Sequence, residues 1–286
     1  MNFRLSRRKV SRSLGGDLSI FSVLAVAAAF TAMPLILIIS NAFKPLNELF
    51  LYPPQYFVRN PTLNNFYDLF VLMANSWIPI SRYLFNSLFI IIMGTFGNVV
   101  FGSMAAYVLS RHEFRGKKIF NEMVVISLMF APIVLAIPRY LIIAEVGLID
   151  SYWAIIIPSW AATLGVFLLK QFMDGMINDS IIEAAKIDGA SEFGIYWKIV
   201  MPIVKPAWLT LIILTFQQLW ANRGGQFIYA EHLKPLPYAL DQIIGGGVAR
   251  AGVGAAVALI MLIIPVIVFM INQSQIVETM GSSGID

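Results

Sequence analysis

The sequence predicts an all-α polytopic membrane protein with six transmembrane helices. Of its 286 residues, 58% are hydrophobic and only 13% are charged, whereas a soluble domain carries about 25% charged residues. The chain has no cysteine, which excludes disulfides and thiolate metal sites. Its only histidines, His112 and His232, argue against an imidazole metal cluster. We therefore expect neither a metal site nor catalytic residues.

A helix needs about 20 apolar residues to cross a bilayer, and six stretches reach or approach that length. They are Leu18–Ile39, Tyr83–Leu109, Ile119–Ile143 with Pro132 and Pro138, Tyr152–Leu169 with Pro158, about Pro206–Trp220, and Val253–Ile271 with Pro265. The first stretch exceeds the 7–15-residue apolar core of a signal peptide, which favours an uncleaved span. We predict an N-terminal segment 1–17, one transmembrane domain 18–274 and a tail 275–286.

Basic residues predict the orientation of these spans. Most of the 20 Lys and Arg residues lie in the N-terminal segment, in the loop after the second span and in the loop after the fourth span. Such loops stay in the cytoplasm, so both termini are expected there, together with the loop at about 171–206. Because topology accounts for the positive charge, we expect no nucleic-acid partner. Tryptophans near the span ends indicate contact with membrane lipid.

The loop at 171–206 is polar and patterned for two short helices. Ser180 and Glu183 form a capping-box pattern, which predicts a helix beginning at Ser180. Gly189 suits the left-handed position that ends a helix. Ser191 follows as a candidate cap for a second helix. Two alanines within the first helix leave a smooth face that could enter a groove on a partner.

This loop resembles the coupling loop of permeases from binding-protein-dependent ABC importers. Their signature is Glu-Ala-Ala, three residues, Gly, nine residues, Ile, one residue and Leu-Pro. The matching residues, with the aspartate that precedes the glycine, are Glu183, Ala184, Ala185, Asp188, Gly189, Ile199 and Pro202. Met201 stands where the family usually has Leu.

The resemblance extends over nearly the whole chain and is closest to the carbohydrate-uptake branch. Segments that look like this maltose-type, MalG-like branch are Asn60–Phe66, Phe85–Leu88, Ala106–Arg111 and Glu278–Ile285. There are two departures. The chain reads Trp220-Ala221-Asn222 where relatives often have Trp-Asn, and it ends in Asp286 where they often have lysine.

The resemblance implies a type I ABC importer transmembrane domain in the plasma membrane of a prokaryote. Such a permease binds no cofactor and performs no chemistry, because a separate ATPase dimer uses ATP and Mg²⁺. Glu183 and Gly189 would dock on that ATPase, with Ala184 and Ala185 as the packing face. A second permease would complete a heterodimer, and an extracellular binding protein would deliver the sugar. The loop with Gly245, Gly246 and Gly247 would reach into the binding protein.

Five polar residues are expected at membrane depth, where polarity is costly. They are Asn86, Asn98, Thr163, Gln217 and Gln218. They would either make hydrogen bonds between helices, which we favour, or contact the sugar.

Two other classes of function compete with a transport subunit. A self-contained, ion-coupled carrier usually needs an ionisable residue deep in a span, but the acidic residues here lie at span ends or in loops. An intramembrane enzyme would need a catalytic cluster within the spans, and none is visible. The chain also lacks a phosphate-binding Gly-x-x-x-x-Gly-Lys-Ser/Thr loop.

Overall fold

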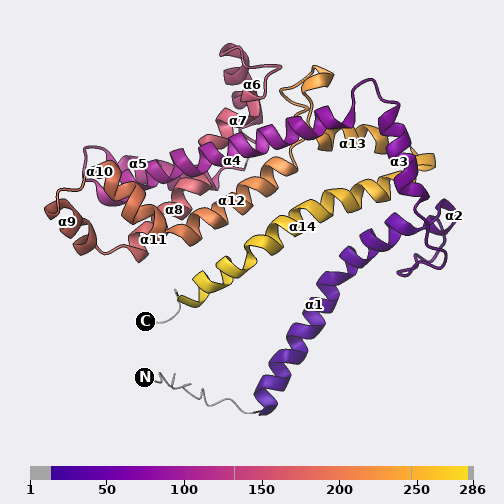
Figure 1. Ribbon diagram of the computed structural model, residues 1–286, viewed down its shortest axis with the longest axis horizontal. Coiled ribbons are helices and arrows are strands. Elements are labelled where there is room, and N and C mark those ends of the chain that lie inside the picture. Colours follow the sequence, from indigo (N-terminus) through magenta and orange to yellow (C-terminus); the bar gives the residue numbers. More distant parts are fainter. Residues whose placement is uncertain (1–13, 132, 246, 283–286) are drawn as a thin grey trace. The chain divides into compact units, whose positions relative to one another are not determined.

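The computed structural model describes residues 14–131, 133–245 and 247–282. Within these ranges the chain is helical and contains no β-strand (Figure 1). It divides into two compact units: the first is Met1–Leu69 with Gly247–Leu259, and the second is Phe70–Gly246 with Ile260–Asp286. Two helices, α3 (Asn64–Ala74) and α14 (Ala251–Ser282), contribute residues to both units.

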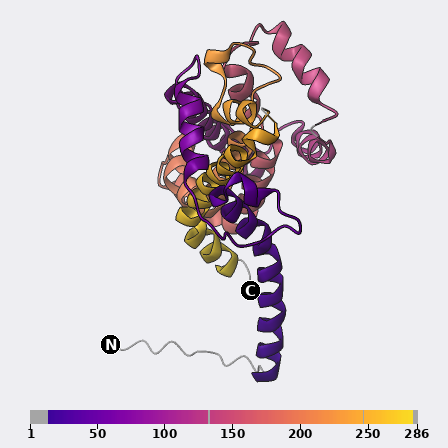
Figure 2. The ribbon, with the colours of Figure 1, turned by 90° about the vertical axis from the view of Figure 1, so that its right-hand side faces the viewer.

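The first unit is built around the long apolar helix α1, Leu14–Phe43, which Figure 2 shows as one continuous coil. Most of its apolar side chains are exposed, as expected for a helix surrounded by lipid. The unit also contains α2 (Leu46–Leu49), the start of α3, the 3₁₀-helix η3 (Val248–Arg250) and the start of α14. The described part of α1 therefore fits the predicted first span.

Asn65 of α3 closes the C-terminal end of α1. Its buried amide donates to the carbonyls of Ala42 at 2.9 Å and Lys44 at 2.8 Å. These are carbonyls that the helix leaves without intrahelical partners. Gly252 of α14 faces the same side chain, and a Cβ there would overlap the Asn65 amide. Glycine is therefore the only residue that fits at this contact.

The second unit is organised by α4, Ile80–Arg111, which packs against α7, α8 and α12 (Figure 1). Its helices, besides the ends of α3 and α14, are α5 (Lys117–Met129), α6 (Ala136–Glu145), α7 (Trp153–Trp160), α8 (Thr163–Met176), α9 (Asp179–Ile187), α10 (Glu192–Ile195), η1 (Tyr196–Val200), α11 (Met201–Ile203), α12 (Lys205–Trp220), η2 (Glu231–Leu233) and α13 (Leu236–Ile244). Gly97 lets α7 approach α4, because a Cβ there would overlap the Trp160 indole. The Trp160 indole N–H donates to the Met93 carbonyl at 2.9 Å.

The predicted span Ile119–Ile143, interrupted by two prolines, is not one continuous helix. This stretch forms α5 and α6, of 13 and 10 residues, and each is shorter than the roughly 20 residues of a spanning helix. The chain leaves the helical conformation at Phe130, and a turn over residues 133–135 precedes α6. Pro132 lies outside the described residues, but a proline disfavours helical backbone in the residue before it. The apolar run therefore continues through a break in the helix.

Of the other predicted spans, Tyr152–Leu169 is also divided, between α7 and α8 at residues 161–162, and each of the rest corresponds to one helix. Among the described residues, four helical segments are long and apolar enough to cross a membrane: Gly15–Phe43, Ile80–Arg111, Trp153–Met176 (α7 with α8) and Ala251–Ile271. A fifth span results if Glu192–Ile203 and Lys205–Trp220, which are bent by 78° at a break, are taken as one. The chain is therefore an all-helical, multi-pass membrane protein.

Candidate functional site

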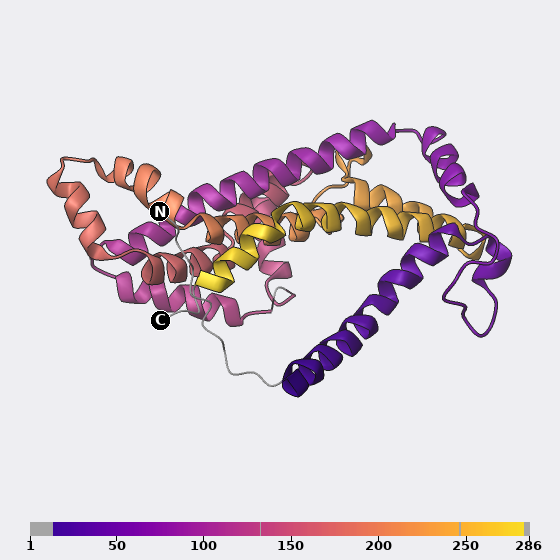
Figure 3. The same ribbon diagram turned by 60° about the horizontal axis from the view of Figure 1, so that its bottom comes forward.

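The residues that match the Glu-Ala-Ala signature lie in the connection between α8 and α12, here named the EAA segment (residues 177–204). It consists of α9, α10, the π-helix η1 and α11. Figure 3 shows the salmon-coloured helices of this segment beside the C-terminal end of α4. The EAA segment is therefore a folded element, held by contacts described below.

The predicted capping box at the start of α9 is wrong. The helix begins at Asp179 with Asn178 as its N-cap, and no side chain caps it. Ser180 and Glu183 both lie inside the helix, so Ser180 has no free cap position to fill. Asp179 instead places a negative charge in the first turn, where the helix dipole favours it.

The prediction for Gly189 is confirmed, because this residue ends α9 in the left-handed conformation with φ of 77°. The Ala190 N–H donates to the Ala185 carbonyl at 3.0 Å, and the Gly189 N–H donates to the Lys186 carbonyl at 3.1 Å. These two bonds form a Schellman motif. Space around Gly189 is open, so the backbone conformation alone requires glycine.

The second predicted cap is also confirmed. Ser191 has extended backbone angles and precedes α10. Its hydroxyl accepts a hydrogen bond from the Gly194 N–H at 3.2 Å. The cap of a new helix therefore lies two residues after Gly189, and α10 itself begins three residues after it, which fixes a tight turn between α9 and α10.

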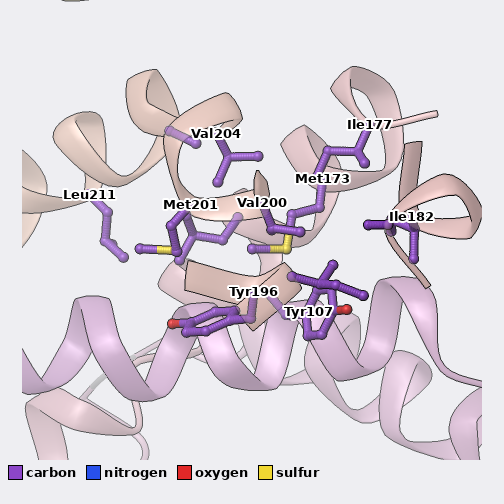
Figure 4. Packing of buried hydrophobic residues seen from close by; sticks show 14 residues of the cluster. Tyr107, Met173, Ile177, Ile182, Tyr196, Val200, Met201, Val204 and Leu211 are labelled. Carbon is purple, nitrogen blue, oxygen red and sulfur yellow. The ribbon is translucent and has the colours of Figure 1, made fainter. Parts of the chain in front are cut away.

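One face of α9 is buried in an apolar cluster, here named the loop cluster. Figure 4 shows Ile182 of α9 near Tyr107 of α4 and Met173 of α8, with Val200 of η1 alongside. Ala185, one turn after Ile182, is also buried in the cluster, at 7% exposure. The loop cluster binds the EAA segment to α4, α8 and α12 by removing apolar surface from water.

The predicted docking face therefore needs one correction. Ala185 packs inward and cannot belong to a surface that a partner contacts, whereas Ala184 is exposed. Glu183, Ile187 and Asp188 are exposed on the same side as Ala184, as the three- and four-residue spacing of a helix requires. This outward face of α9 combines small, acidic and apolar side chains.

Ile187 is the residue that sequence reasoning missed. It is 85% exposed, more than any other large hydrophobic side chain of the EAA segment. It lies four residues after Glu183 on the outward face. That spacing, with an isolated apolar residue among charged ones, was the pattern that could have identified it.

Arg111, at the end of α4, holds the start of the EAA segment. Its guanidinium donates to the Ile177 carbonyl at 2.6 Å and to the Met173 carbonyl, and it pairs with Asp179. Both carbonyls lie at the C-terminal end of α8: that of Met173 also accepts from the Ile177 N–H at 3.3 Å, and that of Ile177 belongs to the C-cap, where intrahelical donors run out. The neighbouring Ser110 hydroxyl donates to the Asp174 carboxylate at 2.5 Å. The Ala106–Arg111 stretch is thus an anchor for the segment.

The last two signature residues lie in the bend that leads to α12. Ile199 is half-buried against the loop cluster, and Pro202 is exposed in the first turn of α11. Met201 is buried, and its carbonyl accepts from the Trp208 indole N–H at 3.1 Å. These residues shape the bend rather than the outward face of α9.

Among the pathway candidates, Asn86 makes hydrogen bonds within the chain with every polar group of its side chain. It is buried and donates to the carbonyls of His232 at 2.9 Å and Lys234 at 2.8 Å. Its carbonyl oxygen accepts from the Tyr152 hydroxyl at 2.7 Å. This occupies both donor hydrogens and the oxygen, so Asn86 is a structural residue in this conformation.

Asn98 also makes the favoured interhelical bond, because its amide donates to the Thr215 hydroxyl of α12 at 2.7 Å. Thr163 is half-buried at the first residue of α8. Gln217 and Gln218 are exposed on α12. The two glutamines are the candidates whose side chains remain open to a ligand.

The glycine-rich loop before α14 is only partly described. Gly245 is the C-cap of α13, Gly247 has φ of 82°, and Gly246 lies outside the described residues. In the loop between α12 and α13, the backbone N–H groups of Ala230 and Tyr229 donate to the carboxylate of Asp150, which lies between α6 and α7. The hydrogen bond from the Ala230 N–H, and to a smaller extent the one from the Tyr229 N–H, lowers the pKa of the Asp150 carboxyl group.

Sequence and structure comparisons agree on the family. The profile described as the inner membrane component of binding-protein-dependent transport systems matches residues 98–279. The chain belongs to this family. It is therefore a membrane subunit of a transport system and not an enzyme. The predictions of a transport subunit and of an ABC permease are confirmed.

The relatives of this permease include named sugar transporters. An arabinooligosaccharide transport permease, AraQ of Halalkalibacterium halodurans, is 30% identical over 223 residues, which cover 76% of each chain. A polygalacturonan/rhamnogalacturonan transport permease, YtcP of Bacillus subtilis, is 30% identical over 230 residues, covering 80% of this chain and 78% of that one.

A solved structure shares the fold. The permease matches a chain of a bacterial ABC transporter involved in the import of the acidic polysaccharide alginate, with a TM-score of 0.75 and 21% identity. The match covers 90% of this chain and 95% of that chain. In a second crystal structure, an alginate transporter is in complex with a periplasmic protein bound to an alginate pentasaccharide.

Proposed function

We propose that this permease forms half of the translocation pathway of an ATP-driven oligosaccharide importer. Its outward α9 face docks on a separate ATP-binding subunit, a second permease forms the other half of the pathway, and an extracellular binding protein delivers the sugar. Relatives named for arabinooligosaccharide and polygalacturonan transport support the substrate class. The match to an alginate importer supports the fold of such an assembly.

The observation that carries the proposal is the two-sided character of α9. Its inner residues Ile182 and Ala185 are buried in the loop cluster, while Glu183, Ala184 and Ile187 face outward. A helix that is packed against the permease on one side and exposed on the other can pass a movement of a docked partner to the rest of the permease. The large exposed side chain of Ile187 supplies apolar area for that contact.

The proposal includes six spans with both termini in the cytoplasm of a prokaryotic cell. The α5–α6 stretch would complete the six: it would be the third span along the chain and would cross the membrane as a broken helix. The excess of Lys and Arg in the loops after the second and fourth spans supports this orientation. The EAA segment then faces the side on which ATP is available.

The docking proposal predicts that Ile187→Glu separates the permease from its ATPase. Burying an isoleucine side chain contributes about 1.5–3 kcal/mol, and a buried unpaired carboxylate opposes binding further. We expect the ATPase subunit to be lost on affinity purification, or its affinity to fall by at least about tenfold. Uptake in proteoliposomes with the binding protein should fall in parallel.

Glu113→Ala is the matched control, because Glu113 is an exposed carboxylate close to the same end of α4. It should leave ATPase binding unchanged. The double variant Glu183→Ala with Gly189→Pro should also uncouple ATP hydrolysis from uptake. Full ATPase retention and normal uptake in Ile187→Glu would refute docking through α9.

A further inference from the structure

Glu192 stands at the meeting point of α4, α9 and α10. One carboxylate oxygen, Oε1, lies 2.8 Å from the Lys186 ammonium in the last turn of α9. The other, Oε2, accepts from the Tyr107 hydroxyl of α4 at 3.0 Å. Oε2 also lies 3.5 Å from Nε2 of His112, directly after α4. A single side chain of α10 thus contacts both neighbouring elements.

The Lys186–Glu192 ion pair spans the turn between α9 and α10. This turn contains Gly189, whose backbone has left-handed dihedral angles and whose surroundings are open. A glycine turn permits α9 to rotate relative to α10. The ion pair links a residue before this turn to a residue after it, and the Tyr107 hydroxyl of α4 donates to the same Glu192 carboxylate.

The apolar loop cluster cannot set this angle alone. Hydrophobic contact is non-directional, so the burial of Ile182 and Ala185 in the loop cluster does not by itself select one orientation of α9. Hydrogen bonds and charge-assisted contacts have preferred directions. The three groups around the Glu192 carboxylate therefore define one orientation of α9.

We propose that Glu192 is a positioning residue that carries movement of α9 to α4. This inference rests on the proposed docking function of α9. The side chains of Lys186 and Glu192 are each 50% exposed, and exposed pairs contribute little to folding stability. Loss of Glu192 should therefore leave the permease folded and bound to its ATPase, while weakening transmission.

The test compares Glu192→Ala with Glu113→Ala in the complete transporter reconstituted in proteoliposomes. Glu113 also pairs with a lysine, Lys117 at 2.7 Å, but Lys117 belongs to α5 and not to the EAA segment. In Glu192→Ala we expect unchanged ATPase association and basal hydrolysis, with hydrolysis stimulated by sugar-loaded binding protein reduced about fivefold. Stimulation equal to that of wild type would overturn the proposal.

Charge reversal tests the ion pair itself. The double variant Lys186→Glu with Glu192→Lys should recover stimulation relative to Glu192→Lys alone, because the pair is restored with opposite polarity. A structural role that depends only on residue size would show no such recovery. Equal loss in the single and double variants would overturn the proposal.

If the ATPase dissociated from the Glu192→Ala complex, the variant Tyr107→Phe would test whether the contact between Glu192 and α4 transmits the movement. This variant keeps the ring in the loop cluster and removes only the hydroxyl that reaches Glu192. Reduced stimulation would support the proposal, and normal stimulation would overturn it. Failure of Ile187→Glu to release the ATPase would instead refute docking, so the two failures are distinguishable.

Discussion

The two ends of α4 hold their neighbouring segments by different chemistry. At the N-terminal end, buried Asn86 and Ser87 bind the backbone of residues 232–236, with the Ser87 hydroxyl accepting from the Leu236 N–H at 2.8 Å. At the C-terminal end, Arg111 and Glu192 use charged groups. At the N-terminal end the two buried contacts are neutral and lie beside a charged one, from Arg82 to the His232 carbonyl at 3.1 Å, whereas at the C-terminal end the contacts of Arg111 and Glu192 are themselves charged and the Glu192 side chain is half-exposed.

This difference predicts different mobility at the two ends. A buried amide cannot exchange its protein partners for water, so breaking its bonds leaves unsatisfied groups at a high cost. An exposed ion pair exchanges with water at little cost. We expect the N-terminal end of α4 to act as a fixed frame, while the C-terminal end adjusts as the EAA segment moves.

The largest effect is expected from Asn86→Ala, which removes the buried contact at the N-terminal end of α4. The substitution removes three hydrogen bonds and leaves the buried Lys234 carbonyl without its partner, while the His232 carbonyl and the Tyr152 hydroxyl still accept from Arg82. We expect about 2–4 kcal/mol of destabilisation, of which about 1–3 kcal/mol comes from the unsatisfied Lys234 carbonyl and about 1 kcal/mol from the lost hydrogen bond of the Tyr152 hydroxyl. Thermal unfolding in detergent would measure it, with exposed Ser81→Ala as control. Equal melting temperatures of the two variants would contradict the idea of a fixed frame.

Arg111→Lys should have a smaller effect at the opposite end. Lysine keeps the charge that pairs with Asp179 but lacks the planar fork that reaches the Met173 and Ile177 carbonyls together. A loss of about 1–2 kcal/mol is expected for the hydrogen bonds to a charged donor. Protease sensitivity of the EAA segment should rise, while that of residues 230–236 should not. Uniform sensitivity across both regions would argue against separate ends.

Two glycine-to-alanine changes should have opposite signs. Gly189→Ala places a Cβ on a left-handed residue and should destabilise α9 by about 1–2 kcal/mol. Gly175→Ala lies inside α8 with open space around it and should stabilise by about 0.5–1 kcal/mol. Unfolding measurements on both variants would test this. Stabilisation by Gly189→Ala would contradict the Schellman ending of α9.

The smallest effect concerns Asp150, a charged exception near the N-terminal end of α4. Its pKa is lowered by the N–H groups of Ala230 and Tyr229, so the contact is stabilising when the carboxylate is ionised. That stability is present above the ordinary aspartate pKa of about 3.9 and is lost as pH falls through the lower folded pKa. The protection of the amides of residues 229–230 against hydrogen exchange, relative to their intrinsic exchange rates, should fall only in acid. Asp150→Asn should remove this pH dependence; an unchanged acid response would exclude Asp150 as its source.

Local patterns in the sequence predicted the features that depend on nearby residues. Four of the predicted spans correspond to single spanning segments, because apolar length alone determines which stretches can cross a bilayer. The left-handed Gly189 and the Ser191 cap follow from backbone chemistry within one turn. The signature spacing likewise led to the family that the comparisons show.

Only the tertiary structure decided which side chains face which partner. Ala184 and Ala185 are equivalent in the motif, but the loop cluster buries Ala185 and leaves Ala184 exposed. Tyr107 precedes Glu192 by 85 residues, and Asn86 precedes the loop that it binds by nearly 150. Contacts at such separation depend on how α4 packs, and no local pattern records that packing. The sequence by itself therefore determined the family, four of the spans and the turn at Gly189 and Ser191, whereas packing determined the outward face of α9 and the contrast between the ends of α4.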